Sequence, residues 1–176
     1  PITPLFQAAV FLIAGIDNFL AVRFAHVILS VATVAFVGLT AWRMFGHRIG
    51  LTCAFLVTIN PMIMFYITEL LSETIFAFLL SLAFLLWVNT MFAKTHSWLW
   101  ATATGVAAGL AMLTRPSAMA FPIAVVLWLM LTNRHRLVAL SMPMLMGVCL
   151  AMSPWVIRNY LLFGNLILFS DNGAGA

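Results

Sequence analysis

Charged residues are scarce in this chain. Asp, Glu, Lys and Arg make up 7% of its 176 residues, and only four residues are acidic. Soluble domains carry about 25% charged residues, which cover the surface that faces water. Because 65% of this chain is hydrophobic, a soluble fold would need a core with almost no surface. The sequence therefore predicts an all-α protein, a polytopic bundle of transmembrane helices.

Cysteine and polar motifs are also rare. Cys53 and Cys149 lie inside apolar runs, and the sequence contains no Cys-x-x-Cys motif or Cys/His cluster. We therefore expect two packing residues and no metal site. No polar face carries a basic stripe, which makes nucleic acid a poor partner. The chain begins at Pro1, and we expect it to carry no signal peptide of its own and to be an internal fragment of a longer protein.

The sequence consists mainly of long apolar runs, and we interpret residues 1–176 as one membrane domain. Residues 1–18 hold an apolar stretch too short to cross a hydrocarbon core of about 30 Å, which predicts a juxtamembrane helix. Ser153 as an N-cap and Pro154 at the first helical position predict an external interfacial helix over 154–164. Between them the sequence predicts six spans, at about 20–41, 50–66, 70–92, 97–114, 117–132 and 137–153.

One of these spans carries a helix-packing motif. Gly105 and Gly109 form a Gly-xxx-Gly pattern within 97–114. Small residues at this spacing let two helix backbones approach closely in a membrane. We therefore predict a tight helix–helix contact along this face.

The few charges divide between the two sides of the predicted membrane. Five of the eight basic residues lie in alternate loops, which the positive-inside rule makes cytoplasmic: Arg43, Arg48, Lys94, Arg134 and Arg136. The remaining charges fall at the opposite, external face: Asp17, Glu69, Glu73, Asp171, Arg23, Arg115 and Arg158. Charges at a membrane edge are costly, so we expect the functional site there.

Glu69 and Glu73 share a helix face, because they lie four residues apart at the start of the span 70–92. One interpretation is favourable placement of acids at a helix N-terminus. The other is a pocket that binds substrate hydroxyls or a cation, or that orients a catalytic group. Glu73 is the stronger candidate for a pocket, since it lies one turn deeper in the membrane.

Three arginines are candidates at the same face. Arg115 precedes Pro116, which biases it away from helical geometry, and Arg158 lies in the segment 154–164. Each is either an anchor at the headgroup level or a guanidinium that binds a phosphate. Arg23 lies just inside the first span and is a third candidate. If the charges form one pocket, Glu73, Arg115 and Arg158 should converge.

The order of these segments resembles bacterial membrane glycosyltransferases of the dolichyl-phosphate-mannose-protein mannosyltransferase type. This class includes the aminoarabinose transferases of lipid A and has the GT-C fold. The resemblance covers about residues 1–170, and the most specific stretch is Pro-Trp-x-x-Arg-Asn-x-x-x-Phe-Gly at 154–164. Three weaker stretches match as well: Ala-Val-Arg-Phe at 21–24, Leu-Ser-Glu-Thr at 71–74 and Gly-Leu-Ala-Met-Leu-Thr-Arg-Pro at 109–116.

The resemblance implies a multi-pass protein of the bacterial plasma (inner) membrane with an external, periplasmic active face. Its partners would be membrane lipid, a polyprenyl-phosphate-linked sugar as donor, and an acceptor that the sequence does not identify. The catalytic Asp is expected in an external loop upstream of Pro1. No catalytic residue is then expected within this chain, which would be inactive alone.

The resemblance also distributes roles among the external residues. Arg115, Arg158 and Arg23 are candidates for binding the phosphate. Glu73, Glu69 and Asn159 are candidates for holding sugar hydroxyls or orienting the pocket. No cofactor is certain, and a divalent cation held by the glutamates stays open.

A secondary transporter or channel subunit is the alternative, since Pro61, Pro116 and Pro143 could break helices as transporters require. A transporter should carry polar residues near the bilayer midplane, whereas these charges gather at one face. An Asp shortly after one further upstream span would favour the enzyme.

Overall fold

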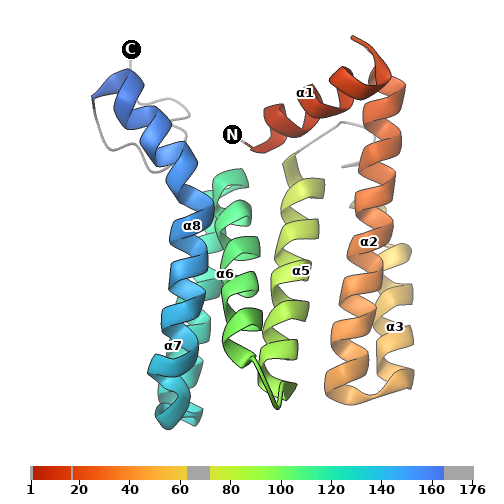
Figure 1. Cartoon of the computed structure of the whole chain (residues 1–176). Helices are drawn as coiled ribbons and strands as arrows, with labels where there is room; N and C mark the ends of the chain where they lie inside the picture. The colour runs from red at the N-terminus through yellow and green to blue at the C-terminus, as the bar shows by residue number, and fades with distance from the viewer. Residues whose placement is uncertain (1, 17, 63–71, 165–176) are drawn as a thin grey trace.

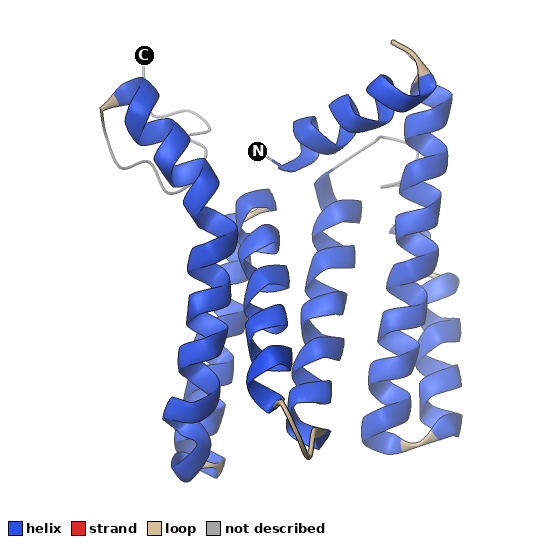
Figure 2. Cartoon of the chain, viewed as in Figure 1, coloured by secondary structure: helices blue, strands red, loops and turns tan. Residues whose placement is uncertain are grey.

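The structure, a computed structural model, describes residues 2–16, 18–62 and 72–164, and every regular element in these ranges is a helix (Figure 1, Figure 2). This confirms the predicted all-α class. The elements are α1 (Ile2–Ala14), α2 (Phe19–Phe45), α3 (His47–Thr58), α5 (Ser72–Phe92), α6 (Ser97–Thr114), the 3₁₀ turn η1 (Pro116–Met119), α7 (Ala120–Thr132), the 3₁₀ turn η2 (Arg134–Arg136) and α8 (Leu137–Phe163).

Three helical segments are long and apolar enough to cross a membrane: Phe19–Phe45, Ser72–Phe92 and Arg134–Phe163. The last of them joins η2 to α8. Two further apolar helices are shorter, Ile2–Ala14 and Pro116–Thr132. The protein is therefore an α-helical membrane protein, and α1 coincides with the short stretch predicted to lie beside the membrane.

The long helices stand side by side, and α1 lies across one end of them (Figure 1). α2 packs against α3 and α5, α5 packs against α6, and α6 packs against α8. Ile2 and Phe6 of α1 rest on the main core cluster. α1 therefore covers the end of the bundle at which α5 begins and α6 stops.

The contact between α6 and α8 is the closest in the bundle and confirms the prediction from the Gly-xxx-Gly motif. A Cβ atom built on Gly105 would lie 1.9 Å from the carbonyl oxygen of Met144, and one built on Gly147 would lie 2.2 Å from that of Thr102. Both distances are shorter than any real contact. The two backbones approach this closely only because glycine stands on both helices.

The predicted span 50–66 differs from the structure at its second half. α3 ends at Thr58, where Ile59 forms the C-cap and its N–H donates to the carbonyl oxygen of Phe55. The break has a local cause, because Pro61 disfavours helical geometry at Asn60. Residues 63–66 of the predicted span lie outside the described residues.

The predicted start of a separate helix at Pro154 was wrong. α8 runs from Leu137 to Phe163 with Pro143 and Pro154 inside it. The hydroxyl of Ser153 donates to the carbonyl oxygen of Leu150 at 2.9 Å, so it bonds back within the helix and does not cap a new one. The last turns of α8 lean away from the rest, as a proline inside a helix causes (Figure 1).

Candidate functional site

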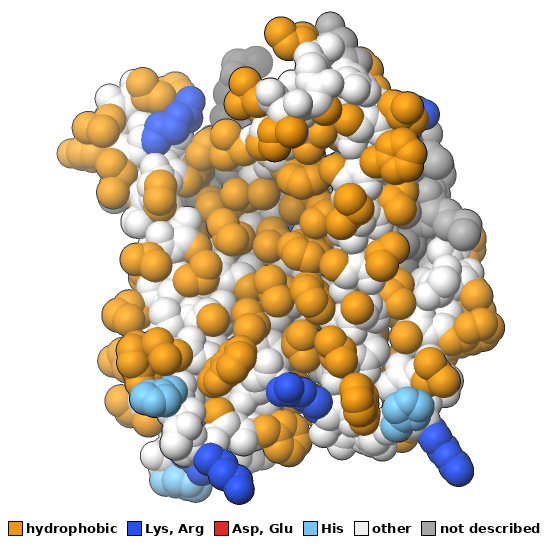
Figure 3. Space-filling model, turned by 45° about the vertical axis from the view of Figure 1, so that its right-hand side comes forward, with side chains coloured by type: hydrophobic (Ala, Val, Ile, Leu, Met, Phe, Trp, Pro, Cys, Tyr) orange, Lys and Arg blue, Asp and Glu red, His pale blue; other side chains and the backbone are white. Residues whose placement is uncertain are grey.

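Five of the eight basic residues gather at one end of the bundle. The α2–α3 connection, the α5–α6 connection and η2 lie at the end opposite α1 (Figure 1). We call this the basic end. Figure 3 shows Lys, Arg and His side chains along one edge of the molecule, below a broad hydrophobic band. The basic end carries the five residues that the sequence analysis grouped together: Arg43, Arg48, Lys94, Arg134 and Arg136.

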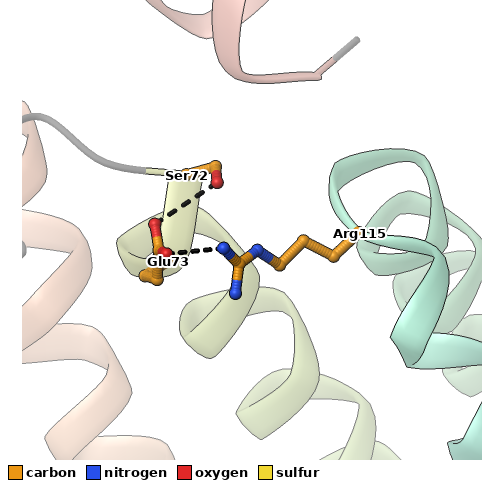
Figure 4. A network of polar contacts seen from close by, with 3 residues as sticks. All are labelled: Ser72, Glu73 and Arg115. Carbon is orange, nitrogen blue, oxygen red and sulfur yellow. Dashed lines mark hydrogen bonds and ion pairs between the residues drawn. The ribbon is translucent and has the colours of Figure 1, made fainter. Parts of the chain in front are cut away.

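An ion pair lies at the other end of the bundle, between two residues 42 positions apart in sequence. Nη2 of Arg115 lies 2.5 Å from Oε1 of Glu73. The hydroxyl of Ser72 donates to the second carboxylate oxygen of Glu73 at 3.3 Å. Figure 4 shows the two side chains reaching toward each other from α5 and from the end of α6, with α1 above them. We call this the Glu73 end.

Local backbone geometry explains why this pair forms. Glu73 lies in the first turn of α5, where the helix dipole favours an acid. Arg115 follows the last residue of α6 and is extended, with φ −145° and ψ 128°, as a residue before proline prefers. Leaving the helix at this point turns the side chain of Arg115 toward α5.

The pair is only partly shielded. The side chain of Glu73 is 21% exposed and that of Arg115 is 45% exposed. A guanidinium has five N–H donors, and among the described residues Arg115 bonds through its side chain to Glu73 alone. Donors therefore remain on the guanidinium for an anion, while the carboxylate restrains its position.

Arg158 is held differently, by residues of its own helix. Its Nη1 donates to Oδ1 of Asn159 at 3.3 Å, and its guanidinium lies over the ring of Trp155 at 5.4 Å from the centroid. Asn159 is buried, with 2% of its surface exposed, and takes part in a further interaction. Nε1 of Trp155 is buried without a hydrogen-bond partner among the described residues.

The structure thus unites part of the predicted pocket. Glu73 and Arg115 are in contact, and Arg158 lies toward the same end near the close of α8, without a direct bond to either of them. Arg23 is exposed on α2, and no described residue bonds to its side chain. Glu69, Asp17 and Asp171 lie outside the described residues.

Two buried polar side chains near the Glu73 end were not singled out as site residues. Thr74 follows Glu73 and is 5% exposed, and its hydroxyl has no partner among the described residues. His26 is fully buried against the edge of Phe6 of α1, and neither ring nitrogen has such a partner. The sequence offered one signal for Thr74 as a site residue, namely its position next to the predicted site acid Glu73.

No group of three His, Cys, Asp or Glu residues comes together in residues 2–16, 18–62 and 72–164. What the Glu73 end offers is a carboxylate, guanidinium groups and buried hydroxyl and amide groups.

A model of the dolichyl-phosphate-mannose-protein mannosyltransferase family matches residues 1–157. The chain belongs to this family. As a member, it is a membrane glycosyltransferase of the GT-C type. The match includes Glu73 and Arg115, whereas Arg158 and Asn159 follow directly after it. No curated protein and no solved structure was found to match the chain.

Proposed function

We propose that this mannosyltransferase-family protein takes a sugar from a polyprenyl-phosphate-linked donor and passes it to an acceptor at the Glu73 end. We place this end at the external, periplasmic side of a bacterial inner membrane. The gathering of five basic residues at the opposite end supports this orientation, because Lys and Arg concentrate in cytoplasmic loops. Family membership supports the glycosyl transfer.

The ion pair between Glu73 and Arg115 is the observation that carries the proposal. When the sugar leaves the donor, negative charge develops on the polyprenyl phosphate and must be stabilised. Arg115 presents a half-exposed guanidinium at the end of the bundle, with donors left over for phosphate oxygens. Its partner Glu73 fixes the group before the phosphate arrives, so little reorganisation is needed.

The other candidates take supporting roles in this proposal. Arg158 and Arg23 supply further positive charge for the phosphate, while Asn159 and Glu69 hold sugar hydroxyls or orient the pocket. In this proposal the acceptor is activated by an Asp that lies upstream of Pro1 in the full-length protein. A divalent cation could also bind at the glutamates. Measuring sugar transfer with and without a chelator would reveal it.

The test is sugar transfer by the purified full-length protein in proteoliposomes. Polyprenyl-phosphate sugars should serve as donors, and nucleotide sugars should not. Arg115→Gln should reduce kcat by about a hundredfold, the usual effect of losing one contact to developing charge. Arg134→Gln is the matched control, because it removes an exposed arginine from the basic end, and it should leave kcat unchanged.

Two outcomes would contradict the proposal. Transfer from nucleotide sugars would show that the donor need not be lipid-linked. Uptake of solute into the vesicles without any sugar transfer would favour the transporter alternative.

A further inference from the structure

A hydrophobic groove of about 820 Å³ lies between α5 and α7. Its wall includes the edge-on contacts of Phe84 with Phe121, at 4.7 Å between ring centroids, and of Trp87 with Trp128, at 6.2 Å. The lining residues of η1, α7 and η2 extend from Ser117 to Arg136. The groove therefore follows the whole length of α7, about 20 Å at 1.5 Å per residue.

Polar groups are distributed unevenly along this groove. Ser117 lines it toward the Glu73 end, whereas Asn133 and Arg136 line it at the basic end. Arg136 is the charged residue of the lining, and Arg115 does not take part in it. A molecule with one anionic group and a long apolar part would therefore place the anion at the basic end.

Arg136 is available to such an anion. Its side chain is exposed and bonds to no described residue. Within the described ranges the one acidic residue is Glu73, which lies at the opposite end. No carboxylate that the structure describes would therefore compete with a phosphate at Arg136.

We propose that the groove between α5 and α7 binds an anionic phospholipid from the leaflet at the basic end. The lipid phosphate lies at Arg136 and Asn133, and an acyl chain follows the aromatic contacts between the two helices. Attraction of anionic headgroups to basic residues at a membrane edge favours this orientation. The proposal is independent of the sugar donor, whose phosphate is assigned to the other end.

Photo-crosslinking of the full-length protein in nanodiscs tests the proposal. The probes are phosphatidylglycerol and phosphatidylcholine that carry the same diazirine-labelled acyl chain, and peptide mass spectrometry locates the adducts. Phosphatidylglycerol should label groove residues of α5 and α7 more than phosphatidylcholine does. Arg136→Gln should lower this labelling about fivefold, the factor for losing one basic residue near an anionic surface.

Two further variants complete the design. Arg134→Gln removes an equal charge from the same turn, and Arg134 does not line the groove, so labelling should persist. Ala124→Trp fills the groove from an exposed position of α7 and should abolish labelling by both lipids. A monodisperse elution profile of each variant shows that the fold is intact.

Three results would overturn the proposal. Equal labelling by the two lipids would show general contact with the bilayer. An equal loss in Arg134→Gln and Arg136→Gln would show a diffuse surface attraction. Displacement of the probe by polyprenyl phosphate, to the same extent in Arg136→Gln, would assign the groove to the sugar carrier.

Discussion

At the scale of single residues, the two best-placed arginines are held by different kinds of contact. Arg115 is fixed across two helices by an opposite charge on Glu73. Arg158 is fixed along one helix by an amide oxygen and an aromatic ring. The orientation of Arg115 thus depends on how α5 and α6 pack, whereas that of Arg158 depends on the last turns of α8. Substitutions at the two sites should fail in different ways.

For Arg158 we predict a graded loss of turnover. A guanidinium can hold two phosphate oxygens in a fixed fork, whereas a lysine keeps the charge and loses the fork. Arg158→Lys should therefore reduce sugar transfer substantially, and Arg158→Ala further, by about a hundredfold. The measurement is transfer from purified donor lipid by full-length variants at matched membrane levels. Near wild-type activity in Arg158→Ala would leave this residue as an anchor.

For Glu73 we predict that activity changes more than stability. Glu73→Gln removes a partly exposed ion pair, which typically contributes at most about 1 kcal/mol. The melting temperature in detergent should therefore fall little, whereas kcat should fall clearly because the guanidinium of Arg115 loses its restraint. The double variant Glu73→Gln/Arg115→Gln should be hardly worse than Arg115→Gln alone. Fully additive losses in the double variant would show that the two residues act separately.

At the scale of elements, the packing of α6 against α8 depends on glycine at both surfaces. Gly105 lies against the backbone of α8, and Gly147 lies against that of α6. The sequence predicted a close contact along the Gly105–Gly109 face, because spacing alone defines a helix face. It did not identify α8 as the partner, since the partner depends on how the chain folds back.

The helix boundaries show a second limit of prediction. Ser153 followed by Pro154 suits a helix start, but the same hydroxyl can bond back to a carbonyl inside a continuing helix. Packing of α8 along its length decides between these two states. The break after Thr58 follows from Asn60 and Pro61. The sequence analysis named Pro61 as a possible helix break only for the transporter alternative, and the predicted span 50–66 ran through it.

We predict that Gly147→Ala and Gly105→Ala destabilise the bundle. Either new methyl group would push into a carbonyl oxygen of the facing helix, and overpacking of this kind typically costs about 1–3 kcal/mol. Ala139→Val is the matched control, because it also adds methyl groups but stands at an exposed position of α8. Thermal unfolding in detergent should show a lower midpoint for the glycine variants alone. Equal midpoints in all variants would contradict the close contact.

At the scale of the whole molecule, the charges separate the two ends. The sequence was sufficient to group five basic residues together, because alternate short loops between spans must lie on the same side of a membrane. It also predicted that Glu73, Arg115 and Arg158 would converge if the external charges form one pocket, and the structure joins the first two. It did not predict that Arg158 would bond to neighbours on its own helix, since side-chain partners depend on the bend of α8 near Pro154.

Single-cysteine labelling should reveal the orientation. In a background that lacks Cys53 and Cys149, cysteines at His47, His96 and His135 should react from the cytoplasmic side. Cysteines at Asn18 and Ser117 should react from the external side. Because Ser117 and His135 lie beyond opposite ends of α7, labelling of both from one side would overturn the arrangement proposed for the membrane.

The composition of α6 has a consequence for how the protein enters the bilayer. α6 has 18 residues but is not among the three helices that are long and apolar enough to cross a membrane by themselves. Many of its residues are small or polar and are buried by its neighbours. Contacts with α5 and α8 should therefore stabilise α6 in the bilayer. In a glycosylation-mapping assay we expect α6 to insert poorly as an isolated segment and well when α8 follows it. Biogenesis would then require that α6 wait at the translocon until its partner is synthesised.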